Sequence, residues 1–265
     1  MKIKSAYTIP KEAKSYEDNE DSYAFSERGD IICLCDGASQ SFSAQDWANL
    51  VSNNFVSVSR DFSEDEVLKI IKEHVSGIDL ANMSWTQMSS FEKGSFTTVL
   101  RLKEGIDGLA VESIGDCMIC YHDLQNRIQT FPYLTEDEFS KNPETISSRI
   151  ELNAGLKNKI QTTKIKRGKN SSNFRGRRKR GYGLSLSGKS TSMMRVRPSS
   201  RRRVNSSIVL LMTDALGQWL CKDKNVNYQK LISIRSSIEF EQLILGLRKK
   251  GLIRIDDTTL LTITF

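Results

Sequence analysis

Residues 31–37 read Ile-Ile-Cys-Leu-Cys-Asp-Gly, an apolar run that ends abruptly at Asp36 and Gly37. A run that is apolar at every position is typical of a strand that is covered on both faces. Residues 208–214, Ile-Val-Leu-Leu-Met-Thr-Asp, have the same pattern and also end in an acid, Asp214. These two runs predict buried strands in a layered structure, each with an aspartate where the strand meets a loop.

The rest of the chain supplies further strands and several helices with apolar stripes. Alternating residues and turn signals predict strands over residues 22–25, 95–102, 108–114, 118–122, 127–131 and 259–265. The four strands between 95 and 131 are expected to form one β-meander. Helical spacing predicts helices that begin near Ser43, Ser63 and Ser237, with Ser43 and Ser63 as N-caps. Residues 132–163 are expected to be irregular to helical. Buried strands with paired helices favour a layered α+β domain.

Charge is distributed very unevenly along the 265 residues. The formal net charge is +7, but residues 164–203 hold 15 Lys or Arg and no acid, and the remainder has 24 bases against 32 acids, a net of −8. Residues 164–206 contain little Val or Leu, so they predict a disordered basic insertion within one domain that spans residues 1–265. Binding of nucleic acid or an acidic partner through residues 164–203, and a local reading-frame error, stay open as alternatives.

Composition excludes several classes of protein. The chain has no run of about 18 apolar residues, and its N-terminus lacks the apolar segment of a secretion signal. Cys117 and Cys120 form a lone CxxC pair, without the second pair that a zinc site would want. We therefore expect a cytoplasmic protein that does not associate with membranes.

Acidic residues gather where the apolar strands meet loops. They are Glu20, Asp21, Asp36, Asp116, Asp214, Asp256 and Asp257. If the strands share a sheet, several of these ends could converge, and converging carboxylates repel one another unless cations hold them together. Oxygen ligands suit hard ions such as Mg²⁺ and Mn²⁺. The pattern predicts a divalent metal site, and the alternative is a set of solvated turn aspartates.

Six short motifs, five of which contain these acids, occur in a fixed order. They are Asn19-Glu20-Asp21, Cys35-Asp36-Gly37-Ala38-Ser39, Gly94-Ser95-Phe96-Thr97, Gly115-Asp116, Thr213-Asp214-Ala215-Leu216 and Asp256-Asp257-Thr258-Thr259-Leu260. Together they resemble the successive motifs of the PP2C-like (PPM-type) metal-dependent protein serine/threonine phosphatases, in particular a bacterial-type subgroup. The resemblance covers about residues 15–135 and 207–265.

The resemblance implies a four-layer α-β-β-α sandwich, in which two antiparallel sheets are flanked by helix pairs. It implies hydrolysis of phosphoserine or phosphothreonine in proteins by a water that bridges two Mn²⁺ or Mg²⁺ ions, with no phosphoenzyme. The expected partner is a phosphorylated protein made by an opposing Ser/Thr kinase, and we expect a monomer.

The resemblance also implies a role for each acidic residue. Asp36 would bridge both ions and the Gly37 carbonyl would bind one of them, while Asp214 and Asp256 would hold the other. Glu20 and Asp21 would hold metal-bound waters. Asp116 would contribute, together with Asp214, to a third and weaker metal position. Asp257 stands where many members have Asn.

Two positions depart from the family pattern. Tyr16 replaces an Arg that grips the phosphate in many members, and Lys11 or Lys14 could substitute only as a point charge. Ala38 replaces a His that is the proposed general acid in some members, leaving Ser39 or a metal-bound water for that role. These departures favour a second hypothesis, in which the chain is a catalytically weak or inactive module that binds phosphoprotein partners. A third hypothesis is nucleic-acid binding through residues 164–203.

Overall fold

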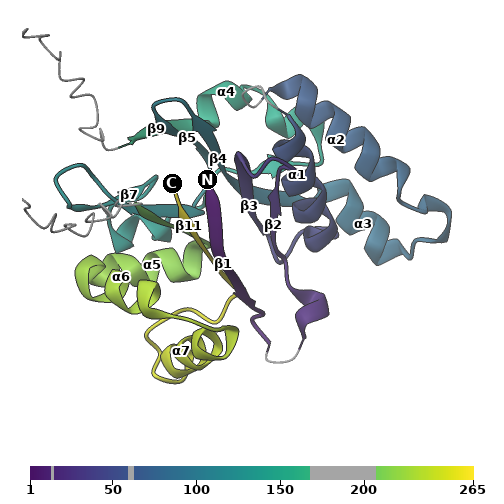
Figure 1. The fold of residues 1–265 in the computed structure, drawn as a ribbon. Coiled ribbons are helices and arrows are strands. Elements are labelled where there is room, and N and C mark those ends of the chain that lie inside the picture. The colour runs from purple at the N-terminus through teal and green to yellow at the C-terminus, as the bar shows by residue number, and fades with distance from the viewer. Residues whose placement is uncertain (13–14, 59–62, 168–206) are drawn as a thin grey trace, which may run out of the picture. The chain divides into compact units, whose positions relative to one another are not determined.

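The computed structural model describes residues 1–12, 15–58, 63–167 and 207–265 (Figure 1). Its strands are β1 (Lys2–Ile9), β2 (Asp21–Phe25), β3 (Ile31–Gly37), β4 (Phe96–Gly105), β5 (Gly108–Ile114), β6 (Met118–His122), β7 (Ile128–Phe131), β8 (Ile146–Ser147), β9 (Gln161–Lys166), β10 (Ile208–Met212) and β11 (Thr258–Thr264). Its α-helices are α1 (Ala44–Ser57), α2 (Glu64–Ser76), α3 (Trp85–Lys93), α4 (Leu156–Lys159), α5 (Asp214–Lys222), α6 (Lys224–Ser233) and α7 (Ser237–Lys249). Short 3₁₀ turns cover Tyr16–Asp18, Leu80–Asn82, Glu136–Ser140 and Ile150–Asn153.

The strands of the described residues form two antiparallel sheets. One sheet has the order β1-β11-β10-β6-β7, and the other has the order β2-β3-β4-β5-β9, with β8 paired to β4. In the first sheet β11 pairs with both β1 and β10, so the two ends of the chain lie side by side, as Figure 1 shows. The predicted buried strands 31–35 and 208–212 are thus confirmed, and they lie in different sheets.

Three buried apolar clusters hold the layers together. The middle cluster joins the two sheets face to face, with Leu34 and Leu100 from one sheet and Leu211 and Ile263 from the other, all fully buried. A second cluster packs α1 and α2 against the β2–β5 sheet. The third packs α5, α6 and α7 against the β1–β11 sheet. Burial of both faces of each sheet explains the continuous apolar runs, and the predicted four-layer α-β-β-α sandwich is confirmed.

The expected meander between 95 and 131 is wrong in one respect. β4 pairs with β5 and β6 pairs with β7, but the chain crosses from one sheet to the other between β5 and β6. Gly115 makes this crossing with φ +96°, a conformation that favours glycine. A Cβ at this position would lie 2.5 Å from Cγ2 of Thr98 and 2.7 Å from the Glu144 carbonyl. The crossing therefore requires glycine, and it delivers Asp116 between the two sheets.

Other local predictions had mixed outcomes. Ser63 caps α2 by accepting the Glu66 amide at 3.3 Å, as predicted. Ser43 precedes α1, but its φ is 45° and its hydroxyl donates to the Asp46 carboxylate instead of capping a backbone amide. The basic insertion was expected to begin at residue 164, but residues 164–166 belong to β9, which pairs with β5. The predictions for residues 168–206 of that insertion, and for Lys14, concern residues outside the described ranges.

None of the helices in the described ranges combines the length and the apolar character that crossing a bilayer requires.

Candidate active site

Four of the predicted acids meet in one cleft of about 380 Å³. Asp36, Gly37, Asp116, Asp214 and Asp256 all line it. A loop segment, residues 139–143 with Thr145, and the side chain of Arg254 form further parts of its wall. Carboxylates from four separate parts of the sequence therefore face a single space between strand ends.

Each acid is placed by the end of a strand. Asp36 lies opposite Asp21 in the β2–β3 pair, and the Thr97 hydroxyl holds its backbone carbonyl at 2.8 Å. Asp116 follows β5 directly after the Gly115 crossing. Asp214 begins α5, two residues after β10 ends. Asp256 lies in the loop between α7 and β11. The strand-end pattern in the sequence thus becomes a cluster in space.

Asp21 connects the two sheets. Its carboxylate comes from β2, and its Oδ2 accepts hydrogen bonds from the Thr259 hydroxyl at 2.7 Å and the Thr213 hydroxyl at 3.1 Å. Thr259 belongs to β11 and Thr213 follows β10, so both donors come from the opposite sheet. Oδ1 of Asp21 is buried and has no hydrogen-bond partner among the described residues.

Asp257 is a second connection, and it acts through the backbone. Only 3% of its surface is exposed. Its Oδ1 accepts the amide of Lys11 at 2.6 Å and its Oδ2 accepts the amide of Glu20 at 2.7 Å. Arg248, on α7, donates to the carbonyls of Pro10 and Asp256. The loop that carries Glu20 and Asp21 is thereby fixed to the loop that carries Asp256.

Burial and mutual repulsion make the ionised form of the clustered acids costly. Burial raises the pKa of Asp36, and the next cause is repulsion from Asp21. Burial raises the pKa of Asp116 to about 7, and Asp214 adds to the shift. The pKa of Asp214 itself is raised by burial, although the Arg254 guanidinium opposes this effect. A cation among these carboxylates would favour their ionised form.

The acidic residues of the cleft offer the oxygen atoms that a hard divalent cation prefers as ligands. The ligand set consists of oxygens, and Oδ1 of both Asp21 and Asp214 is buried without a partner among the described residues. No three histidine, cysteine or acidic side chains in the described ranges are arranged so that they could hold one ion as they stand. Carboxylates without a cation between them repel one another, and Arg254 donates to Oδ2 of Asp214.

Like Asp21, the predicted site residue Glu20 does not line the cleft. Its carboxylate accepts the Lys11 ammonium at 2.7 Å and also the Ser39 hydroxyl. Lys11 in turn donates to Ser39 at 3.0 Å. Lys11 is thus already paired, and Tyr16 is 52% exposed on a 3₁₀ turn. Neither is positioned in the cleft wall to take the place of the phosphate-gripping Arg.

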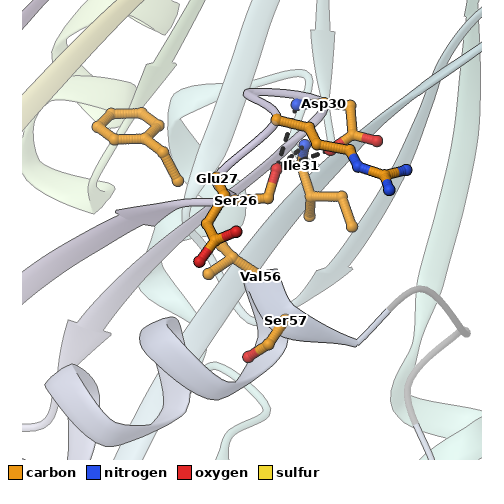
Figure 2. A pocket seen from close by; sticks show the side chains of 8 residues that line it. Ser26, Glu27, Asp30, Ile31, Val56 and Ser57 are labelled. Atoms are coloured by element: carbon orange, nitrogen blue, oxygen red, sulfur yellow. Dashed lines mark hydrogen bonds between the residues drawn. The ribbon is translucent and has the colours of Figure 1, made fainter.

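A larger cavity, of about 480 Å³, lies at the other end of the β2–β3 pair. Figure 2 shows the side chains that line it, with the Ser26 hydroxyl bonded to Asp30 in the connecting turn. Phe25, Ile31 and Val56 make much of its wall apolar. It does not contain the strand-end acids, so the smaller cleft is the better candidate site.

Sequence reasoning missed four functional candidates, although three stand inside or beside the quoted motifs. Thr213 and Thr259 follow the pattern of polar residues beside an acid, but their partner, Asp21, is about two hundred residues away. Asp257 was expected among the strand-end acids and as a replacement for Asn, but its hydrogen bonds to the backbone amides of Lys11 and Glu20 were not expected. Arg254 gave no local signal, because only the fold brings it to Asp214.

Comparisons with known proteins bear on the fold. A scan against protein-family models found no match, and a search of curated proteins found none either. Among solved structures, a bacterial serine phosphatase matches with a TM-score of 0.56 at 11% identity, over 98% of this chain and 96% of that chain. Serine/threonine phosphatase Stp1 from Staphylococcus aureus matches with a TM-score of 0.55 at 12% identity, over 100% of this chain and 97% of that chain.

A third structure is the catalytic domain of the serine/threonine protein phosphatase PstP in complex with two manganese ions. It matches with a TM-score of 0.53 at 14% identity, over 98% of this chain and 97% of that chain. The chain therefore has the fold of the PP2C-like serine/threonine phosphatases, as its motif order predicted.

Proposed function

We propose that this protein hydrolyses phosphoserine and phosphothreonine in proteins, with two divalent cations, Mn²⁺ or Mg²⁺, bound in the cleft. One observation carries the proposal: Asp36, Asp116, Asp214 and Asp256 meet in a single cleft, and the buried Oδ1 of Asp214 has no partner among the described residues. A solvated set of turn aspartates would have no reason to include Asp116 and Asp214, which are only 5% and 9% exposed, because burial of carboxylates is costly.

The residues that would hold the cations line the cleft, and the family resemblance suggests the role of each. Asp36 and the Gly37 carbonyl would hold one ion, and Asp36, Asp214 and Asp256 the other, with Asp116 available for a weaker third position. When bound, such a pair of cations supplies an activated water and an electrostatic clamp for the phosphoryl group. The proposal agrees with the two manganese ions in PstP, which has this fold.

Other residues of the chain position the acidic side chains or determine which substrates can enter the cleft. Thr213 and Thr259 orient Asp21, and Asp257 fixes the backbone that carries Glu20 and Asp21. The cleft is lined mainly by polar groups, so it offers little apolar surface to grip a substrate. Recognition of a phosphorylated side chain would then depend on the phosphate itself, which is consistent with phosphoprotein substrates from a serine/threonine kinase.

The test is hydrolysis of p-nitrophenyl phosphate with Mn²⁺, with and without EDTA, by the wild type and Asp36→Asn. Asp107→Asn is the matched control, because Asp107 is an exposed turn residue outside the cleft. We expect Mn²⁺-dependent turnover that EDTA and Asp36→Asn abolish and Asp107→Asn leaves intact. Phosphoserine, phosphothreonine and phosphotyrosine peptides then define the substrate class.

Two outcomes decide against the proposal. Turnover that persists in EDTA or in Asp36→Asn would place the chemistry elsewhere. A folded wild-type protein that binds Mn²⁺ but turns over none of these substrates would instead support the phosphoprotein-binding module, for which Ala38 and Tyr16 are the relevant departures.

A further inference from the structure

Arg254 has no assigned role, yet it lines the acidic cleft together with Asp36, Asp116, Asp214 and Asp256. It lies in the loop between α7 and β11, two residues before Asp256. Its Nη2 donates to Oδ2 of Asp214, and its side chain is 44% exposed. The guanidinium of Arg254 therefore faces the cleft and is also paired with Asp214, a candidate metal ligand.

Stability alone does not explain this arginine. An ion pair whose basic side chain is nearly half exposed contributes little to folding, since solvent screens it and both side chains lose freedom. A cleft that must admit a phosphate has a different need. The phosphate carries a charge of about −1.5 to −2 and would approach a wall of four carboxylates. The protein therefore benefits from a positive group of its own at that wall.

Other cations of the described residues are less suited to this task. Lys11 is paired to Glu20 and Ser39, and it is not part of the cleft wall. Lys141 lines the cleft but is exposed, and an ammonium is a point charge rather than a fork. The planar guanidinium of Arg254 presents parallel N–H groups that match two oxygens of a phosphate.

We propose that Arg254 binds the phosphoryl group of the substrate, and that Asp214 holds it in the cleft until cations occupy the carboxylates. This inference rests on the proposed phosphatase function. It assigns to the loop between α7 and β11 the task that the N-terminal position Tyr16 does not fulfil. It also requires that Arg254 compete with a divalent cation for Asp214, because both are attracted to the same carboxylate.

The experiment compares the wild type with Arg254→Ala and Arg254→Lys, and also with Lys141→Ala, which removes the other positive charge of the cleft wall. Three quantities are measured: the KM and kcat for p-nitrophenyl phosphate with Mn²⁺, the dissociation constant of inorganic phosphate from the Mg²⁺-saturated protein by calorimetry, and the Mn²⁺ affinity of the metal-free protein. The last two do not depend on turnover.

For Arg254→Ala we expect KM and the phosphate dissociation constant to rise about tenfold to a hundredfold, the effect of losing charge-assisted hydrogen bonds. Its Mn²⁺ affinity should rise roughly threefold to tenfold, because a competing positive charge is gone. Arg254→Lys should lie between this variant and the wild type, and Lys141→Ala should raise both constants by clearly less than Arg254→Ala does, because the exposed Lys141 is only a point charge.

Two results would overturn the inference. One is a phosphate dissociation constant of Arg254→Ala within twofold of the wild-type value. The other is an equal loss in Lys141→Ala, which would mean that the general charge of the cleft matters and Arg254 does not. If the wild type shows no turnover, the proposed function fails, but phosphate and Mn²⁺ binding still decide whether Arg254 receives the anion.

Discussion

Asp257→Asn removes one acceptor oxygen from a carboxylate that uses both. The two oxygens of Asp257 accept the amides of Lys11 and Glu20 at 2.6 and 2.7 Å. An asparagine can accept only one of these amides, and its own NH₂ group would face the N–H of the other. The resemblance to a family that often has Asn here would suggest a neutral change, so the structure and the resemblance give opposite expectations.

The magnitude follows from burial and charge. Asp257 is 3% exposed, and hydrogen bonds to a charged acceptor contribute about 1.5–3 kcal/mol each. Losing one such bond and leaving a buried donor unsatisfied is expected to lower the free energy of unfolding by about 2–4 kcal/mol. Since Glu20 and Asp21 share the released backbone, Mn²⁺ affinity should fall as well.

The assay is urea unfolding of the EDTA-treated protein, followed by tryptophan fluorescence, together with Mn²⁺ titration of the folded protein. Asp107→Asn again controls for the loss of one negative charge at an exposed position. A loss below about 0.5 kcal/mol in Asp257→Asn, the size of an ordinary surface substitution, would refute the reasoning, because it would show that the two amides do not need both oxygens.

Three further predictions concern the cleft and the core. In the metal-free protein the pKa of Asp116 is about 7, above its unfolded value of 3.8. The stability that its protonated form provides is complete below about pH 4 and is lost as pH rises through 7. Urea unfolding with EDTA should therefore show that the free energy of unfolding falls by about 1 kcal/mol between pH 6 and 8. Saturating Mn²⁺ should remove that loss, and the same pH dependence with and without Mn²⁺ would contradict the prediction. Gly115→Ala should cost about 2–4 kcal/mol in urea unfolding, because its Cβ would collide with Thr98, whereas Gly246→Ala, with open space around it, should be neutral or slightly stabilising; equal effects would disprove the steric argument. Leu211→Ala, in the cluster between the sheets, should cost about 2–5 kcal/mol and also weaken Mn²⁺ binding, and intact Mn²⁺ affinity would show that the sheets hold the acids independently.

The parts of the structure that have a strong local signal could be predicted from sequence. The buried strands around Cys33 and Leu210 were predicted from continuous apolar runs. The four carboxylates in the cleft were predicted from their place at strand ends. The helix α7 was predicted from its apolar stripe, in which Phe240, Ile244 and Leu247 are buried.

Elements without such a stripe were not predicted. The helix α3 buries none of its residues, and α6 buries only Asn227, Tyr228 and Leu231, so neither has a clear apolar stripe. The strand β1 lies at a sheet edge and is largely part-exposed, which weakens its pattern. Asp257 accepts the backbone amides of Lys11 and Glu20, which are far away in the sequence, and Arg254 reaches Asp214 only because of the path of its loop. Patterns among neighbouring residues cannot predict such contacts.

The hydrogen bonds from Thr213 and Thr259 to Asp21 show that the cleft belongs to neither sheet alone. Its geometry depends on the distance and tilt between two layers, which the buried side chains between them determine. A substitution in that interior, far from any acid, can therefore alter how the carboxylates meet. Selection for a working cleft in this protein would consequently act on the volume and shape of interior residues such as Leu34 and Leu211, and evolutionary drift in the interior would be limited by chemistry as well as by folding.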